Sequence, residues 1–335
     1  MKRRDFIKTA ALSTAAVALN RVLPEAATPE HLKTPSSSNA PSLLKREYGK
    51  TGIQLSIIGL PGLMLSRMEQ DAANRIVAES FERGVNYFDV AASYGRGSAE
   101  TRLGPALEPY RKKVFLSSKT RRRTREGAEF ELKQSLERLK TDYVDLYLLH
   151  GLNYVENDVD AAFKKGGAME ILLQAKKEGR VRYLGFSAHT IEAATAAMDR
   201  YDFDSLLFPF NFASILKLGF GPEAMEKAQA KGVARIALKA CVRAKWASPE
   251  VQKRSEYARS WYQPLTEPRE QELGLRFSLG QPITAALPPS YEELHRRALD
   301  IAMSYRPLDD EELREVKAVA ATVVDPLFPR DYSRR

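Results

Sequence analysis

The chain has 335 residues, of which 44% are hydrophobic and 28% are charged, which is an ordinary globular composition. Disorder, collagen and coiled coil are therefore excluded as descriptions of the whole chain. The single cysteine, Cys241, excludes an intrachain disulfide and a cysteine metal cluster. Because there are also only four histidines, we expect no metal site. The formal net charge of +9 is basic but not extreme.

The N-terminus combines a basic head with a short apolar run. Arg3 and Arg4 precede the uncharged stretch from Thr9 to Leu19, which is too short for a transmembrane helix and typical of a secretory signal. The arginine pair, followed by Asp5, Phe6 and Lys8, resembles the bacterial twin-arginine signal. We therefore predict export by the twin-arginine machinery to the periplasm or another extracytoplasmic space, with no stable membrane insertion after cleavage.

Three segments are expected from composition. Residues 1–27 form the signal peptide, and residues 28–43, which are rich in Pro, Ser, Thr and Asn, form a flexible linker. Residues 44–325 form the globular domain. Within that domain, the sequence at 46–48 and 53–55 flanks Gly49-Lys50-Thr51-Gly52 and predicts a hairpin positioned to close the floor of a barrel.

Short apolar runs then alternate with amphipathic stretches of helical period. The eight runs are Ile57–Leu60, Tyr87–Val90, Val114–Ser117, Tyr143–Leu149, Val181–Phe186, Ser205–Phe208, Val233–Leu238 and Ile283–Leu287. The predicted helices include Met68–Glu82, Glu126–Leu139 (with Phe130 on its apolar face), Ala161–Glu178 and Ile191–Arg200. This repeat predicts parallel strands joined by helices, and eight such strands favour a closed (β/α)₈ TIM barrel. Residues 240–264 fit no strand and are expected to form a long loop.

In a barrel, chemistry is expected where the strands end at their C-terminal edge. The second, third and fourth runs lead to Asp89 with Tyr94, to Lys119 and to His150. A lysine ammonium near a tyrosine hydroxyl lowers the pKa of the phenol, so that it can give up a proton near neutral pH. The alternative is an Asp–Lys ion pair that fixes the barrel, with Tyr94 and His150 merely capping it. Because all four residues occur together at the ends of adjacent strands, the sequence favours the catalytic interpretation.

At these residues the sequence resembles the aldo-keto reductase family of NADPH-dependent (β/α)₈ barrels. The similarity runs from about residue 46 to residue 313. It rests on Tyr48-Gly49-Lys50-Thr51-Gly52, Tyr87-Phe88-Asp89 with Ser93-Tyr94-Gly95, Ser117-Ser118-Lys119, Asp145-Leu146-Tyr147-Leu148-Leu149-His150 and Gly185-Phe186-Ser187. The resemblance implies a reductase or dehydrogenase acting on aldehydes, ketones or sugars. In such an enzyme the cofactor supplies the hydride, and the protein orients the reactants and stabilises the developing charge electrostatically.

The resemblance also assigns roles to the four strand-end residues. It implies that Tyr94 is the general acid that protonates the carbonyl oxygen, and that Lys119 lowers the pKa of Tyr94. Asp89 is expected to hold Lys119, and His150 to orient the carbonyl by hydrogen bonding.

The expected cofactor contacts depart from the family pattern. Ala188 and Leu207 replace the usual Asn and Gln partners of the carboxamide, which leaves Ser187 with His189 or Asn211 as substitutes. Leu238-Lys239-Ala240-Cys241 offers no aromatic ring for the nicotinamide. Lys239 is interpreted either as facing a phosphate or a substrate anion, or as a solvated or salt-bridged lysine. After the last strand, Pro288, Ser290 and Glu293 occupy cofactor positions, with Arg296 or Arg297 as candidates for the adenosine phosphate. NADPH is inferred from the family, with NADH as the alternative.

The run Lys119-Thr120-Arg121-Arg122-Arg123-Thr124-Arg125 is the densest basic segment. It is interpreted either as a solvated loop or as a rim that attracts anionic substrates. A single basic loop is not a nucleic-acid footprint, so no nucleic-acid partner is expected. Residues 311–314 look like part of a solvated C-terminal helix. Two functions follow: an exported carbonyl or sugar oxidoreductase, or a catalytically weak dinucleotide-binding redox sensor or subunit on the same barrel.

Overall fold

The computed structural model describes residues 43–329. The predicted signal peptide, residues 1–27, and the predicted linker up to residue 42 lie outside the described residues. The export prediction therefore remains a prediction from the sequence. None of the described helices is both long and apolar enough to cross a membrane.

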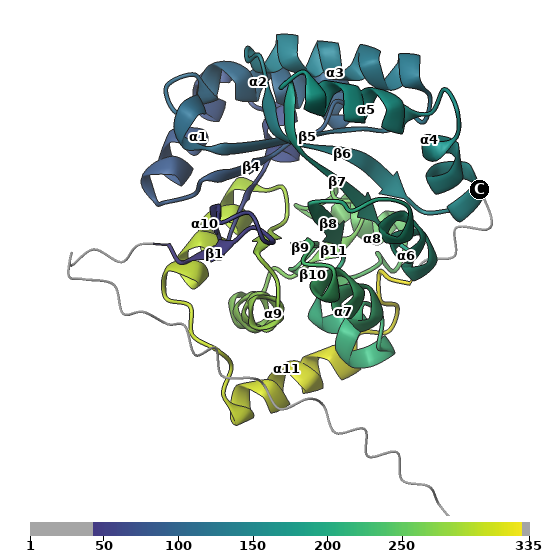
Figure 1. The fold of residues 1–335 in the computed structure, drawn as a ribbon. Helices are drawn as coiled ribbons and strands as arrows, with labels where there is room; N and C mark the ends of the chain where they lie inside the picture. The colour runs from purple at the N-terminus through teal and green to yellow at the C-terminus, as the bar shows by residue number, and fades with distance from the viewer. Residues whose placement is uncertain (1–42, 330–335) are drawn as a thin grey trace, which may run out of the picture. The chain divides into compact units, whose positions relative to one another are not determined.

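The core of the fold is a sheet of eight parallel strands that closes on itself (Figure 1). The strands are β3 (Leu60–Pro61), β4 (Tyr87–Asp89), β5 (Phe115–Thr120), β6 (Val144–Leu152), β7 (Val181–Ala188), β8 (Ser205–Phe208), β9 (Ala234–Leu238) and β12 (Ala285–Leu287). Closure is made just before β3, where Gly59 N donates to Ala286 O at 3.0 Å and Ala286 N donates to Ile57 O at 2.8 Å. The predicted (β/α)₈ barrel is confirmed, and the first predicted strand starts later because Ile57 and Ile58 lie at this junction.

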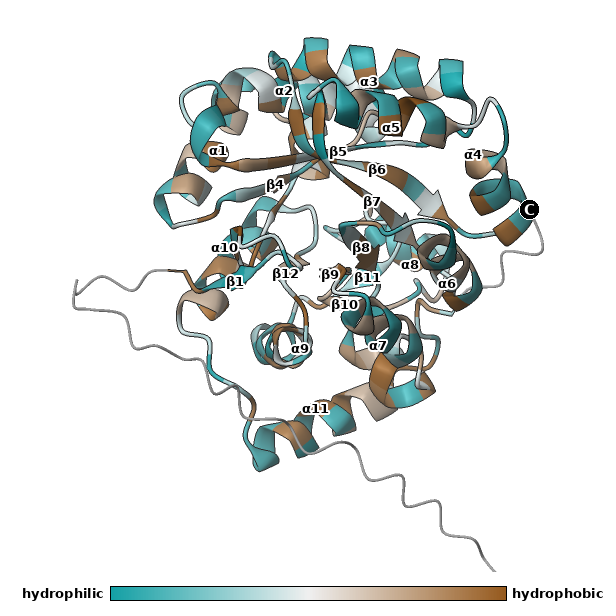
Figure 2. Cartoon of the chain, in the orientation of Figure 1, coloured by the Kyte–Doolittle hydropathy of each residue, from teal (hydrophilic) through white to brown (hydrophobic). Residues whose placement is uncertain are grey.

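Helices surround the strands (Figure 1). They are α1 (Gln70–Glu82), α2 (Ser98–Leu107), α3 (Arg125–Leu139), α4 (Ala161–Phe163), α5 (Ala168–Lys177), α6 (Ile191–Arg200), α7 (Pro222–Ala230), α8 (Pro249–Arg254), α9 (Pro268–Gly280), α10 (Glu292–Met303) and α11 (Asp310–Thr322). Short 3₁₀ or π turns cover Gly62–Arg67, Tyr94–Gly97, Arg111–Lys113, Val155–Asp160 and Ala213–Lys217. Figure 2 shows apolar strands inside and mixed helix surfaces outside, as burial of one helix face requires.

Two of the predicted helices are corrected. The stretch 161–178 is divided into α4 and α5, because Gly166 adopts a left-handed φ of 75° between them. In α3, Phe130 is 58% exposed, although the sequence placed it on the apolar face. The helical period instead buries Ala128, Leu132 and Leu139 against the barrel.

A hairpin precedes the barrel, as predicted. Strands β1 (Lys45–Glu47) and β2 (Gln54–Ser56) pair antiparallel. Tyr48, directly after β1, and Leu55, in β2, are fully buried in one cluster with the inward-facing side chains of the barrel strands. The ring of Tyr48 lies 4.9 Å from that of Phe115 in β5. The hairpin therefore packs against the side chains of the barrel interior.

Residues 240–264 are not the featureless loop that the sequence predicted. Strands β10 (Val242–Ala244) and β11 (Gln263–Pro264) pair antiparallel, and α8 lies between them. This short helix starts at Pro249 and is capped by Ser248, whose hydroxyl accepts from Val251 N at 3.3 Å. The capped helix and the strand pair fix the aromatic residues that precede β11.

Candidate active site

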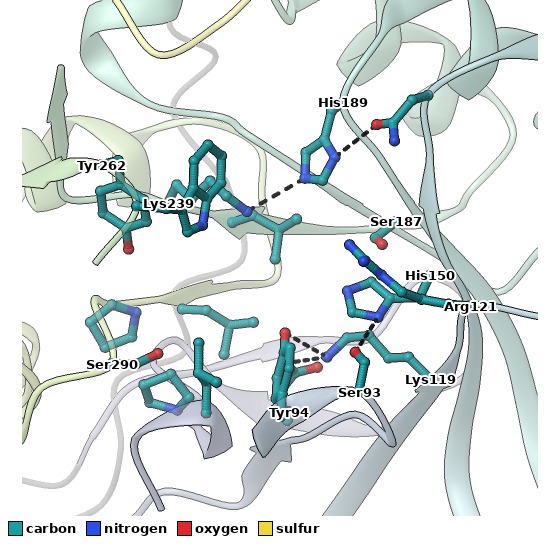
Figure 3. A pocket seen from close by; sticks show the side chains of 18 residues that line it. Ser93, Tyr94, Lys119, Arg121, His150, Ser187, His189, Lys239, Tyr262 and Ser290 are labelled. Carbon is teal, nitrogen blue, oxygen red and sulfur yellow. Dashed lines mark hydrogen bonds and ion pairs between the residues drawn. The ribbon is translucent and has the colours of Figure 1, made fainter. Parts of the chain in front are cut away.

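The four predicted strand-end side chains are brought together at the C-terminal edge of β4, β5 and β6 (Figure 3). Lys119 Nζ donates to Asp89 Oδ2 at 2.5 Å and to the hydroxyl of Tyr94 at 3.4 Å. The ring of Tyr94 stands edge-on to that of His150, with 5.7 Å between their centres. Tyr94 itself lies in the turn that follows β4.

The Asp89–Lys119 pair is almost completely buried. The two residues expose 2% and 1% of their surface. Asp89 also accepts hydrogen bonds from Tyr87 at 3.1 Å and from Ser117 at 2.8 Å, and Lys119 also donates to Val90 O at 2.8 Å. A buried ion pair is tolerated when its remaining hydrogen-bonding capacity is satisfied in this way. The pair therefore holds the ammonium at a fixed place beside Tyr94.

The pKa of Tyr94 corrects one expectation. Burial raises the pKa of the phenol above its ordinary value, and the Lys119 ammonium lowers it without reversing the shift. The ammonium is closer to the Asp89 carboxylate, at 2.5 Å, than to the phenol oxygen, at 3.4 Å, so much of its charge is already compensated. The phenol is thus fully protonated at neutral pH and remains a proton donor.

His150 is a neutral imidazole in this setting. Burial and the positive charges of Lys119 and Arg121 lower its pKa well below the ordinary value of a histidine. Its Nδ1 lies 3.4 Å from the hydroxyl of Ser93. A neutral imidazole at this position can donate one hydrogen bond to an oxygen atom bound next to Tyr94.

These side chains line a cavity of about 540 Å³. A second cavity of about 410 Å³ adjoins it, and the two share Leu63, Trp261, Tyr262 and Ser290 in their walls. Among the described residues, no group of three or more His, Cys, Asp or Glu side chains is placed to hold a metal ion. The arrangement is suited to proton transfer at one end of an elongated site.

Comparison with known proteins places this fold and site in a family. Residues 57–252 match the model of the Aldo/keto reductase family. The chain belongs to the aldo/keto reductase family. Its similarity to an uncharacterised oxidoreductase of Bacillus subtilis is 35% identity over 156 residues, covering 43% of this chain and 48% of the relative. It is also 29% identical to the L-galactose dehydrogenase of Arabidopsis thaliana over 169 residues, covering 46% of this chain and 51% of that enzyme.

The matched part of the chain spans about half the length of these relatives. Among solved structures, an aldo-keto reductase from Klebsiella pneumoniae in complex with NADPH superimposes with a TM-score of 0.60. The match covers 85% of this chain and 96% of the Klebsiella protein at 20% sequence identity. At this identity the likeness is evidence for the fold alone.

The structure separates the residues that the family resemblance proposed for the cofactor. Ser187, His189, Lys239, Pro288 and Ser290 line the first cavity. The Ser187 hydroxyl accepts a hydrogen bond from Gly151 N at 2.8 Å, which fixes its orientation. These five positions are therefore open to a ligand bound beside Tyr94.

The four other candidate cofactor residues lie elsewhere. Asn211 is fully buried and lines neither cavity, because its side-chain oxygen accepts from Ser214 N at 2.9 Å and caps the turn Ala213–Lys217. Glu293 lines the second cavity only. Arg296 pairs with Glu79 and Glu292, and Arg297 donates to the carbonyl of Thr266, so that neither lines a cavity.

The main lining residues that the sequence did not identify are Trp261 and Tyr262. The family pattern has an aromatic ring directly after the seventh strand, where this chain has Leu238. The structure supplies rings from just before β11 instead, more than 20 positions further along the chain. Two adjacent aromatic residues in a polar segment were the available signal, but only the β10–β11 pairing brings them to the cavity.

Lys239 has an unusual backbone. Its φ is 56°, in the left-handed region that is costly for residues other than glycine. Its Nζ lies 3.5 Å from His189 Nε2 and 5.7 Å from the centre of the Trp261 ring. The strained residue follows β9 directly and presents its charge to the first cavity (Figure 3).

Proposed function

We propose that this protein is an NADPH-dependent oxidoreductase that interconverts small carbonyl compounds and alcohols. The observation that carries the proposal is the contact of the Tyr94 hydroxyl with a buried, Asp89-held Lys119, at the wall of a ligand-sized cavity. Aldehydes, ketones and sugars are the substrate class. The NADPH complex of the Klebsiella aldo-keto reductase supports the choice of cofactor, with NADH as the alternative.

The residues present fit a nicotinamide dinucleotide. Such a molecule has two ends, and the two adjoining cavities share one wall, so that one ligand can occupy both. In the first cavity, the Ser187 hydroxyl would hold the carboxamide, and the rings of Trp261 and Tyr262 would pack against the nicotinamide. In the second, Arg67 and Arg259 would face the phosphate groups, and of the two carboxylates in that wall, Glu292 is paired with Arg296 and Glu293 would face away from them toward the sugar. When bound, the cofactor supplies the hydride that reduces the carbonyl carbon.

The chain's own residues handle the proton. Neutral His150 donates a hydrogen bond that orients the carbonyl oxygen, and Tyr94 transfers its hydroxyl proton to that oxygen. The Lys119 ammonium, 3.4 Å away, stabilises the phenolate that is left. Asp89 keeps Lys119 charged and in place. The carbonyl thus gains a hydride and a proton and becomes an alcohol, and Tyr94 recovers its proton from solvent.

Replacement of Tyr94 by Phe tests the proposal. The substitution keeps the ring and removes the acid, so carbonyl reduction should fall at least about a hundredfold, which is the lower range for general acid catalysis. Reduction is assayed on a panel of aldehydes, ketones and aldoses with NADPH and NADH, and nucleotide affinity by calorimetry. Affinity should change little. Equal rates in the two proteins would refute the role of Tyr94.

The same experiment addresses the alternative function. A dinucleotide-binding sensor would bind NADP⁺ tightly and be protected against thermal unfolding, yet reduce none of the carbonyls. The buried and fully hydrogen-bonded Asp89–Lys119 pair favours turnover, because binding a nucleotide does not require it. No saturable binding of either nucleotide would eliminate both functions.

We further propose that the protein is exported by the twin-arginine pathway. The support is the pair Arg3-Arg4 ahead of an apolar run too short to span a bilayer. Changing both arginines to Lys should retain the protein in the cytoplasm, as measured by cell fractionation. A double variant found in the periplasm at the wild-type level would refute this proposal.

A further inference from the structure

The wall of the first cavity carries more positive than negative charge. Its charged lining residues are Lys119, Arg121 and Lys239, and Asp89 is the one carboxylate among the described residues that line it. Asp89 and Lys119 form an ion pair at 2.5 Å and largely neutralise each other. Arg121 therefore supplies positive charge that the Asp89–Lys119 pair does not neutralise.

Arg121 differs from its neighbours in the basic run 119–125. The other three arginines pair with carboxylates: Arg122 with Glu131 at 3.0 Å, Arg123 with Asp158 at 2.9 Å and Arg125 with Glu170 at 3.4 Å. Within residues 43–329, the guanidinium of Arg121 has no carboxylate within ion-pair distance. Arg121 and Arg122 are exposed, as a solvated loop predicts, whereas Arg123 is largely buried and Arg121 also lines the cavity.

The position of Arg121 relates it to the proton-transfer groups. Arg121 follows β5 by one residue, and Figure 3 shows its side chain beside His150 and on the Ser187 side of the cavity. Its charge helps to lower the pKa of His150 and partly offsets the burial that raises the pKa of Tyr94, so it is electrostatically coupled to both side chains. An anion bound at Arg121 would consequently lie close to the site where Tyr94 protonates a carbonyl oxygen.

We propose that the substrate is a carbonyl compound that also carries a carboxylate or phosphate group, and that Arg121 binds this group. The inference rests on the proposed oxidoreductase function and specifies its substrate class. The guanidinium has a planar set of donors that matches both kinds of anion and can bind them through two hydrogen bonds. Neutral aldehydes and sugars lack the group that Arg121 would recognise.

Lys239 adds to the same preference. Its strained backbone places Nζ 3.5 Å from His189 Nε2, on the cavity wall formed by β7 and β9. A substrate that reaches across the cavity from Arg121 would therefore also lie near the Lys239 ammonium. Since opposite charges attract more strongly in a partly enclosed site, a negatively charged substrate gains both affinity and a faster encounter.

Matched pairs of substrates test the inference. The pairs are 4-oxobutanoate with butanal, D-glucuronate with D-glucose, and D-glyceraldehyde 3-phosphate with D-glyceraldehyde. For at least one pair we expect kcat/KM for the anion to exceed that for the neutral compound by about tenfold or more. In Arg121→Met this ratio should fall by about ten- to a hundredfold, the usual effect of losing a hydrogen-bonded charge. Arg121→Lys should retain part of the preference.

Arg122→Met is the matched control. It removes the same charge from the neighbouring position, where the side chain is 60% exposed and paired with Glu131. The anion preference should persist in this variant, because Arg122 does not line the cavity. The inference is overturned if no pair shows a preference, if the preference survives in Arg121→Met, or if Arg122→Met removes it equally.

A binding measurement separates this inference from the proposed function. Succinate and inorganic phosphate cannot be reduced, yet either should raise the midpoint of thermal unfolding of the wild type and of Arg122→Met in a saturable way. The rise should be lost in Arg121→Met. If no carbonyl is reduced but this pattern holds, the oxidoreductase proposal fails and the anion site stands. If carbonyls are reduced but neither anion stabilises the protein through Arg121, the anion site is refuted and the function stands.

Discussion

On the side of the barrel mouth formed by β4, β5 and β6, the proposed catalytic side chains belong to the strands or to the first turn after them. On the side formed by β7, β9 and β12, much of the cavity wall comes from the segment between β9 and α10 instead. The first side carries a buried ion pair whose groups are all hydrogen-bonded. The second carries the exposed ring of Trp261, the buried ring of Tyr262 and the strained Lys239.

This difference matches a division of work between chemistry and recognition. Proton transfer depends on atoms held within tenths of an ångström, and strand positions hold them well because neighbouring strands fix the backbone. Recognition of a ligand tolerates change, and loops supply it because they vary without disturbing the barrel. We therefore expect substitutions on the two sides to have different costs.

The largest expected difference is in stability. Lys119→Met leaves the Asp89 carboxylate buried without its partner, and breaking such a pair by removing one member costs about 3–5 kcal/mol. Lys239→Met, on the other side, removes a half-buried charge and should cost less than about 1 kcal/mol. The free energy of unfolding is measured by urea denaturation followed by circular dichroism.

A double variant provides the control. In Lys119→Met with Asp89→Leu neither charge remains in the core, so much of the lost stability should return. Similar losses for Lys119→Met and Lys239→Met would contradict the contrast between the two sides.

The same contrast explains what the sequence predicted and what it did not. Asp89, Lys119 and His150 follow directly from strand ends, because the C-terminal edges of adjacent parallel strands must meet. Tyr94 follows from the short turn after β4. Each of these predictions depends only on local pattern and on the order of strands, and the structure brings all four residues together.

The other wall could not be predicted in this way. Trp261 and Tyr262 reach the cavity through the pairing of β10 with β11, which are too short for a periodic signal: three and two residues. Asn211 was assigned by position in the chain, but a local hydrogen bond to Ser214 N turns its side chain to the backbone. The direction of the Tyr94 pKa shift could not be predicted either. Burial raises this pKa more than the Lys119 ammonium lowers it, and the extent of burial cannot be read from the sequence.

A second prediction concerns nucleotide affinity on the loop-built side. Trp261→Ala and Tyr262→Ala each remove a ring that lines both cavities, and aromatic contacts of this kind contribute about 0.5–1.5 kcal/mol. The affinity for NADP⁺, measured by calorimetry, should therefore fall by up to about tenfold. Phe130→Ala is the control, because its ring is 58% exposed on α3 and lines neither cavity. If the Phe130 variant binds as weakly as the other two, these rings do not form the nucleotide wall.

A third prediction concerns backbone strain. Lys239 and Lys140 have left-handed φ values of 56° and 51°, and Lys140 caps the end of α3 outside both cavities. Glycine adopts this conformation without steric cost, so each Lys→Gly change should stabilise the fold by up to about 1 kcal/mol in urea denaturation. Only Lys239→Gly should also weaken the binding of anions to the first cavity. A loss of anion binding in Lys140→Gly would show that the effect is not local to the site.

The smallest expected effect is that of pH on His150. Burial and nearby positive charges hold its pKa well below the ordinary value, so the imidazole is neutral over the whole range from about pH 6 to 8. The lowered pKa determines how His150 responds to acid. A group with a lowered pKa keeps its neutral, hydrogen-bonding form as the pH falls through 6.5, where a histidine in an unfolded chain takes up a proton. Proton donation by Tyr94 is likewise constant there, because burial raises the pKa of its phenol. Hence kcat/KM for a neutral carbonyl should stay flat between about pH 6 and 8, and the His150 ring signals, assigned in NMR spectra with a His150→Asn variant, should not shift over that range.

The urea-unfolded chain is the control, because its histidine signals should titrate near pH 6.5. A tenfold loss of kcat/KM per pH unit below 6.5, accompanied by titration of the folded His150 signals, would contradict this prediction. It would mean that the ring takes up a proton in acid and that its place on β6 does not keep it a neutral hydrogen-bond donor.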